Sequence, residues 1–257
     1  MDLGLQGRVA LVMGASRGIG RGIATVLARE GASVAIASRT EEKLQEAAAA
    51  IEKPATEAGG QVTAFVADTG DLERLAVLPA DVEAELGPVE ILVANTGGPP
   101  YGGALEHQLP DWEAAYRELV LAPRVLAEAV LPGMRERGWG RIVNVGSTTT
   151  IEPNPALNLS NSHRMATVGF LKTLSREVAG DGITVNTVAT GRFATERLAD
   201  GGGSLESAEA AAREEVPVGR LGQPEEYGDL VAFLCSERAA YITGTVIPID
   251  GGLLRSA

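Results

Sequence analysis

A glycine-rich segment that follows an apolar run constrains the fold of this chain more than any other stretch. Residues 9–20 read VALVMGASRGIG, which predicts a buried strand, a sharp turn and the start of a helix. Glycine lacks a Cβ, so the chain can bend tightly here and a ligand can approach the backbone. The first N–H groups of the helix are free, and with the helix dipole they form an anion site. We therefore expect a phosphate-bearing ligand at this turn. The residues predicted to hold it are Gly14, Ser16, Arg17, Gly18, Ile19 and Gly20.

Apolar runs and helical patterns alternate along the rest of the chain. This alternation predicts an α/β fold, namely a Rossmann-type, doubly wound, seven-stranded parallel sheet with helices on both faces. Pro54 is expected to break the second helix or to begin a new turn there. The predicted strands are residues 9–12, 33–38, 61–68, 89–95, 140–146, 183–189 and 245–249, and the longest predicted helices, of which the second is a single helix or a helix pair, are residues 41–58, 111–137 and 158–179.

The domain organisation is predicted to be simple. No shift in composition and no internal repeat divides the chain, so residues 1–257 are expected to form a single domain. One connection, residues 190–224, is longer than usual and contains a flexible run from Asp200 to Ser204. Long connections in compact domains often cover a binding site. We therefore expect a substrate lid at about residues 191–223.

The end of the second predicted strand bears on the choice of cofactor. In a Rossmann unit an acidic residue at this position bonds the ribose 2′-hydroxyl of NAD, whereas a nearby arginine accommodates the 2′-phosphate of NADP. This chain has Ser38 and Arg39 there, and Arg17 lies in the glycine turn. Two cations without an acid favour NADP(H) over NAD(H). The alternative, that both arginines are solvated surface charges, stays open.

The glycine spacing, G-x-x-x-G-x-G, resembles that of the short-chain dehydrogenase/reductase family, and the similarity extends from Leu5 to Gly252. The run Asn95-Thr96-Gly97-Gly98 is similar to the N-A-G turn of that family. The resemblance implies NAD(P) binding and hydride transfer with a small-molecule carbonyl or alcohol substrate, as in the 3-oxoacyl-acyl-carrier-protein reductases. It also implies further cofactor contacts, from Asp68 to the adenine, from Asn95 and Gly97 beside the cofactor, and from Thr195 to the nicotinamide.

The catalytic positions of the family are only partly retained. In the family a serine is followed by a tyrosine and then a lysine, and an asparagine lies on the preceding helix. Ser147 matches the serine, but Ser160 and Arg164 stand at the tyrosine and lysine positions, and Leu119 stands at the asparagine position. The segment 168–174 resembles the V-x-G-x-x-K-x-L run of the family and gives the same register. The resemblance thus implies catalytic roles for Ser147, Ser160 and Arg164.

The substitutions change how a proton can be delivered. A serine hydroxyl is a far weaker acid than a phenol, so Ser160 cannot do the work of a tyrosine unaided. Arg164 can hold a ribose hydroxyl and supply positive charge, although its geometry and fixed protonation differ from those of lysine. The two serines can still polarise a carbonyl as hydrogen-bond donors. The proton would then come from water, from His163 or from Tyr101. The alternative for His163 is a histidine on the helix surface, and the alternative for Tyr101 is a loop aromatic that shields the pocket.

The composition bounds the partners of the protein. The net charge is −12 and the Lys and Arg residues are scattered, so we expect no nucleic acid and no anionic membrane as a partner. No apolar run approaches the ~20 residues that span a bilayer. The first residues lack a signal peptide and the single Cys235 fits a reducing compartment, which together predict a cytoplasmic protein. His107 and His163 lie outside any ligand pattern, so no metal site is expected. The family resemblance implies a homo-oligomer, either a tetramer or a dimer.

Three functions compete at this point. The first is an NADP-dependent reductase of a ketone or a 3-oxoacyl thioester with altered proton delivery, which the intact glycine turn favours. The second is a catalytically weak or inactive nucleotide-binding protein, which the missing tyrosine, lysine and asparagine favour. The third is a carbon–halogen lyase, for which Arg164 is a faint indication. Lyases of that kind lack the cofactor glycines and keep the tyrosine, so this chain departs from them on both counts.

Overall fold

Seven parallel strands form one sheet in the computed structural model, which describes residues 1–197 and 204–256. The strand order is β3-β2-β1-β4-β5-β6-β7, and every neighbouring pair is parallel. This order confirms the predicted doubly wound Rossmann-type fold, and it places the topological switch point between β1 and β4. The strands are β1 (Val9–Met13), β2 (Ser33–Ser38), β3 (Val62–Val66), β4 (Ile91–Ala94), β5 (Gly140–Val145), β6 (Ile183–Thr190) and β7 (Val246–Ile249).

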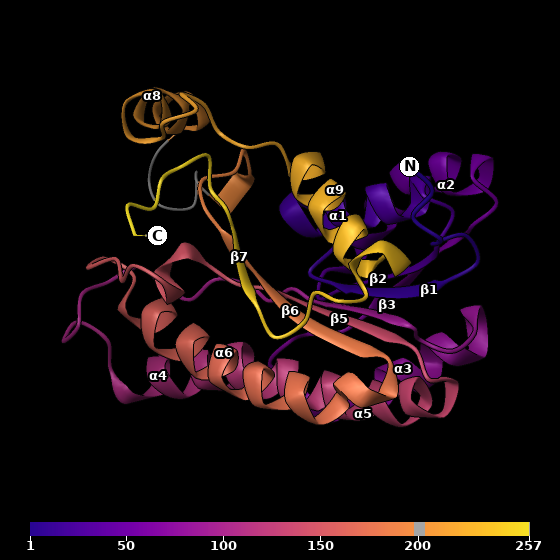
Figure 1. Cartoon of the computed structure of the whole chain (residues 1–257). Helices are drawn as coiled ribbons and strands as arrows, with labels where there is room; N and C mark the ends of the chain where they lie inside the picture. Colours follow the sequence, from indigo (N-terminus) through magenta and orange to yellow (C-terminus); the bar gives the residue numbers. More distant parts are fainter. Residues whose placement is uncertain (198–203, 257) are drawn as a thin grey trace.

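Helices cover both faces of the sheet (Figure 1). One face carries α1 (Gly18–Arg29), α2 (Glu41–Glu57) and α9 (Pro224–Cys235), which share a core that includes Ile23 and Val231. The other face carries α3 (Leu72–Leu86), α5 (Ala122–Arg137) and α6 (Asn158–Val178), which share a core that includes Leu78 and Leu171. Successive residues of β1 and β4 alternate between these two cores, which explains why both strands are apolar throughout.

The helices α1 and α9 pack closely against each other at two glycines. A Cβ on Gly22 would lie 2.5 Å from the backbone of Pro224, and a Cβ on Gly228 would lie 2.8 Å from the carbonyl oxygen of Gly22. Any larger residue at either position would force the helices apart, because real Cβ atoms do not approach a backbone so closely. The crossing therefore fixes the helix that begins at the glycine turn.

Pro54 does not interrupt the second helix, so the predicted break is wrong. The helix α2 continues to Glu57 with Pro54 inside it. The proline lies close to the carboxyl end, where the loss of one hydrogen bond affects few residues, and the N–H of Ala58 still bonds the Pro54 carbonyl at 3.3 Å.

The region predicted as one long helix or a helix pair is continuous, with an irregular centre. A π-helical turn, η1 (Arg117–Leu121), joins α4 (Leu109–Tyr116) to α5. Thr167 of α6 donates a hydrogen bond from Oγ1 to the Leu119 carbonyl at 2.5 Å. Such turns are frequent near functional sites, and Glu118 of this turn lines the cleft described below.

The long connection after β6 contains α8 (Leu205–Glu215), which Ser204 caps. Residues 198–203, which include most of the glycine run of the predicted lid, lie outside the described residues. Within the described part of the chain, no helix combines the length and the apolar character needed to cross a membrane.

Candidate active site

The predicted cofactor-binding residues and the three predicted catalytic positions line one cleft of about 710 Å³. The cleft lies where the strands end, on the side of the sheet at which a doubly wound fold binds its ligands. The structure therefore brings together residues that are spread along most of the sequence. The predicted residues at the cleft are Gly14, Ser16, Arg17, Gly18, Ile19, Gly20, Ser38, Arg39, Asp68, Asn95, Gly97, Ser147, Ser160, Arg164 and Thr195.

The glycine turn has the geometry of an anion site. Gly14 and Gly18 have φ values of 59° and 55°, a conformation that residues with a side chain rarely adopt. A Cβ on Gly20 would lie 2.2 Å from the Gly14 carbonyl oxygen, so only glycine fits there. Asn95 donates from Nδ2 to the same oxygen at 3.2 Å and thereby ties the turn to the end of β4. The first turn of α1 contains no acidic residue, so no carboxylate of this turn competes with a ligand for its free N–H groups.

The end of β2 offers a second polar contact for a ligand. The Ser38 hydroxyl is buried and has no hydrogen-bond partner among the described residues. A buried polar group without a partner costs free energy, so this hydroxyl fits a ligand oxygen supplied from outside the chain. Exposed Arg39 follows it at the rim of the cleft.

Arg17 is less free than the sequence indicates. Its guanidinium forms an ion pair with Glu196, at 2.6 Å between Nη1 and Oε2, and this hydrogen bond lowers the pKa of the Glu196 carboxyl. Arg17 is thus a partly exposed charge with a partner from the segment after β6. Glu196 follows β6 and is far from the glycine turn in sequence, so no local pattern predicts the pair.

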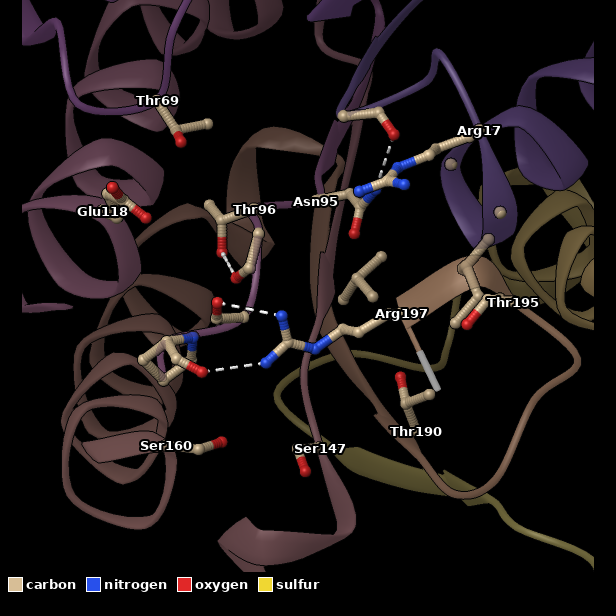
Figure 2. A pocket seen from close by; sticks show the side chains of 18 of the residues that line it. Arg17, Thr69, Asn95, Thr96, Glu118, Ser147, Ser160, Thr190, Thr195 and Arg197 are labelled. Carbon is tan, nitrogen blue, oxygen red and sulfur yellow. Dashed lines mark hydrogen bonds between the residues drawn. The ribbon is translucent and has the colours of Figure 1, made fainter. Parts of the chain in front are cut away.

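A carboxylate that the sequence analysis missed lies near Asp68. Glu118 projects from the π-helical turn into the cleft, where Figure 2 shows it near Thr69. Burial, together with the charge of Asp68, raises the pKa of Glu118, and the charge of Arg39 opposes this shift. The region in which the family resemblance places the adenine is thus lined by two acids and one arginine.

Two serine hydroxyls lie at the catalytic end of the cleft (Figure 2). Ser147 follows β5, and its Oγ accepts a hydrogen bond from the Thr149 N–H at 3.2 Å. Ser160, on α6, is 5% exposed, and its Oγ shares a 3.2 Å hydrogen bond with the Thr149 hydroxyl. Thr149 therefore links the two predicted catalytic serines.

Arg164 connects α6 to the end of β5 and to the loop after β4. It donates to the Val145 carbonyl at 2.7 Å and to the Gly97 carbonyl at 3.3 Å. Burial and the neighbouring positive charge of Arg197 lower the pKa of Arg164 to about 10. The side chain still carries its charge at neutral pH, and it lines the same cleft as the two serines.

The two candidate proton donors are placed differently. His163 is buried, its Nδ1 lies 2.8 Å from the Leu159 carbonyl oxygen, and its ring centroid lies 5.2 Å from that of Trp112. It does not line the cleft, and the alternative of a surface histidine is wrong as well. Tyr101 does line the cleft and is 48% exposed.

A buried tyrosine lies behind the cleft. Tyr227 of α9 is fully buried, accepts a hydrogen bond from the Thr190 hydroxyl at 3.1 Å and donates to the Val188 carbonyl at 3.0 Å. Burial raises its pKa well above the ordinary value, so Tyr227 is a worse acid than a free tyrosine. It therefore does not replace the tyrosine that is missing at position 160.

Arg197 is another cleft residue that the sequence analysis missed. It donates to the carbonyls of Gly98 at 3.0 Å and Pro99 at 2.9 Å, and its guanidinium carbon lies 5.7 Å from the centre of the Tyr101 ring. Figure 2 shows the side chain reaching across the cleft toward the loop after β4. Its sequence neighbourhood carries no periodic signal, and its contact with residues 98 and 99 depends on the fold.

Among the residues that the structure describes, no group of three or more His, Cys, Asp or Glu side chains could hold a metal ion.

The parallel sheet, the glycine turn at its switch point and the cleft beside it define a dinucleotide-binding α/β protein of the Rossmann class. Residues 14–254 match the profile of a protein family described as enoyl-(acyl carrier protein) reductase. The chain belongs to the short-chain dehydrogenase/reductase family, a family of oxidoreductases.

Individual relatives resemble the chain over its whole length. It is 36% identical over 255 residues to the 3-oxoacyl-acyl-carrier-protein reductase FabG of Haemophilus influenzae, a match that covers 98% of this chain and 100% of the relative. The structure of L-sorbose reductase from Gluconobacter frateurii, complexed with NADPH and L-sorbose, has a TM-score of 0.91 at 33% identity. This match covers 100% of this chain and 100% of that chain. YwfH, an NADPH-dependent reductase involved in bacilysin biosynthesis, has a TM-score of 0.90 at 29% identity, with 97% of this chain and 99% of that chain covered.

Proposed function

We propose that this protein is an NADP(H)-dependent reductase of a small ketone or a 3-oxoacyl thioester, with a proton-delivery route that uses no catalytic tyrosine. The observation that carries the proposal is the single cleft that joins the glycine turn to Ser147 and Arg164. The H. influenzae relative is a 3-oxoacyl reductase, and the two structural neighbours are NADPH-linked reductases, which supports the same class of reaction.

The residues present fit a phosphorylated dinucleotide. The glycine turn and the start of α1 would hold the pyrophosphate, because their N–H groups are free and a Cβ would fill the space. The Ser38 hydroxyl, which lacks a partner in the described chain, and the Arg39 guanidinium would hold the 2′-phosphate. Thr195 and Asn95 would lie beside the nicotinamide half. When bound, NADPH would supply a hydride to the substrate carbonyl carbon.

The charge that develops on the substrate oxygen needs stabilisation by groups of this chain. Ser147 can donate a hydrogen bond to that oxygen, and Ser160 can do so if its hydroxyl turns away from Thr149. Arg164 remains protonated and places a fixed positive charge in the same cleft. The proton itself would come from water or from Tyr101, since His163 lies outside the cleft.

A second candidate is a nucleotide-binding protein with little or no activity. The specific observation in its favour is that Ser160 and Arg164 both use their polar groups in structural hydrogen bonds, to Thr149 and to backbone carbonyls. The intact glycine turn does not support the carbon–halogen lyase hypothesis.

One experiment separates the two candidates. NADPH binding is measured by the change in nicotinamide fluorescence, and turnover is then measured as loss of absorbance at the reduced-nicotinamide band with a panel of ketones and 3-oxoacyl thioesters. Binding with turnover supports the reductase, and binding without turnover on any member supports the inactive protein. Failure to bind NADPH contradicts both.

We also propose that residues 1–257 act as a single domain, that residues 191–223 cover the substrate, and that the protein assembles as a homo-oligomer. The length of the connection between β6 and α9 supports a cover over the cleft, which its first residues already line. Light scattering after size-exclusion chromatography would measure the assembly directly.

A further inference from the structure

Two positive side chains meet at one loop of the cleft. Arg164, from α6, donates to the carbonyl of Gly97, while Arg197, from the segment after β6, donates to the carbonyls of Gly98 and Pro99. The three acceptors belong to consecutive residues, so the two guanidinium groups lie on adjacent peptide units of the loop after β4. Burial and the positive charge of Arg197 both lower the pKa of Arg164, and the second effect is expected for neighbouring cations.

Among the described residues, no carboxylate forms an ion pair with either guanidinium. Within residues 1–197 and 204–256, the acids at the cleft that form ion pairs do so with other side chains. No acid of these ranges forms an ion pair with Arg164 or Arg197. A guanidinium has five N–H donors, and each of these side chains uses two of them on backbone carbonyls. Two partly buried cations with spare donors favour an anion between them, because an unpaired charge in a cleft is costly.

The cations lie at the substrate end of the cleft. They share the cleft with Ser147 and Ser160, and Figure 2 shows Arg197 extending between the glycine turn and the two serines. A planar guanidinium binds a carboxylate through two parallel hydrogen bonds, which also fixes the orientation of the bound molecule.

From this geometry we infer that Arg164 and Arg197 bind the carboxylate of the substrate, so that the preferred substrate is a small oxo acid. This inference rests on the proposed reductase function. In the reaction the carbonyl carbon of the oxo acid gains a hydride from NADPH, its oxygen gains a proton from solvent, and the products are the hydroxy acid and NADP⁺. The carboxylate is unchanged and serves only to bind and orient the substrate.

The test compares acids with their neutral esters. The probes are 2-oxobutanoate, acetoacetate and levulinate, which place the carbonyl at increasing distance from the carboxylate, each paired with its methyl ester. Binding to the protein saturated with NADP⁺ is measured by calorimetric titration, and turnover is measured with NADPH. We expect at least one acid to bind roughly 10- to 100-fold more tightly than its ester, as for hydrogen bonds to a charged group.

Four variants test whether the preference for an acid over its methyl ester depends on Arg197. Arg197→Met should remove most of it, and Arg197→Lys should retain part of it. Gly98→Ala keeps the charge but should displace it, because the added Cβ would lie 2.1 Å from the Arg197 guanidinium carbon. Arg192→Met is the matched control: Arg192 belongs to the same connection, pairs with Glu215 and does not line the cleft, so the preference should be unchanged.

The possible failures are distinguishable. If no acid binds better than its ester, or if Arg197→Met keeps the preference, the inference is overturned. It is also overturned if Arg197→Met weakens NADPH binding tenfold or more, because the arginine would then hold a cofactor phosphate. If an acid binds with the expected preference but no NADPH is consumed, the carboxylate site stands and the reductase function fails.

Discussion

Replacement of Gly20 by alanine tests the physical core of the proposed function. The new methyl group would lie 2.2 Å from the Gly14 carbonyl oxygen and 2.7 Å from the Asn95 side-chain nitrogen. Ordinary contacts of this kind are about 3.5 Å, so the glycine turn or the end of β4 must move by ~1 Å. The N–H groups that would hold the pyrophosphate are carried by this turn, and they would lose their alignment.

The expected loss is large for binding and moderate for stability. A displacement of ~1 Å in a positioning element costs on the order of 100-fold, so the Kd for NADPH should rise by about that factor. Overpacking of a tight site costs about 1–3 kcal/mol, which corresponds to roughly 2–12 °C in Tm for a chain of this size. The assays are fluorescence titration with NADPH and thermal unfolding followed by circular dichroism.

Two other glycine variants serve as controls. Gly140→Ala introduces a contact of 2.5 Å to the Met134 sulfur at the opposite end of the sheet, so it should lower Tm without changing the Kd. Gly169→Ala meets nothing within 4 Å on α6, so it should raise the free energy of unfolding by about 0.5–1 kcal/mol. If the Kd of Gly20→Ala for NADPH lies within threefold of that of the natural protein, the turn does not bind a pyrophosphate and the proposal fails.

Three further predictions concern the charges and hydroxyls of the site and its surroundings. Arg39→Ala should weaken NADPH by about 10- to 100-fold and NADH much less, in paired fluorescence titrations, and an equal loss for both would refute the 2′-phosphate contact. The double variant Ser160→Tyr, Arg164→Lys should raise NADPH-dependent turnover of a ketone or 3-oxoacyl thioester; no gain would show that the substrate pocket has also changed. Hydrogen bonds from Arg220 and from the Gln223 backbone lower the pKa of Glu226 from 4.5 to about 2, so its stabilising contribution is present above about pH 4.5 and is lost as the pH falls toward 2. Glu226→Gln should therefore lower Tm at pH 7, by on the order of 1–3 °C for an exposed pair, and the difference should shrink in acid; a constant difference from pH 7 to pH 3 would contradict this assignment.

The sheet and its ligand turn could be predicted because their signals are local. The strand from Ser33 to Ser38 has the predicted bounds. The predicted cofactor residues gather at one edge because parallel strands end on the same side. The position of Ser160 and Arg164 in the cleft agrees with the register counted from Ser147.

The missed features depend on contacts between distant segments. The ion pair of Arg17 with Glu196, and the bonds of Arg197 to Gly98 and Pro99, join segments that only the folded sheet brings together. Likewise, nothing in the pattern around His163 distinguishes an exposed helix position from one packed against Trp112. Residue type alone cannot decide such cases, because burial depends on what the rest of the chain places there.

The tight crossing of Gly22 and Gly228 also bears on how the protein is made. All of β1 to β6 precede α9 in the chain, so α1 leaves the ribosome long before the helix that fixes its angle exists. A nascent chain that stops short of α9 would contain the complete first βαβ unit without the helix that packs against Gly22. If the chain binds the dinucleotide as proposed, binding would add to the stability of finished chains, and chains that end before α9 would lack that gain.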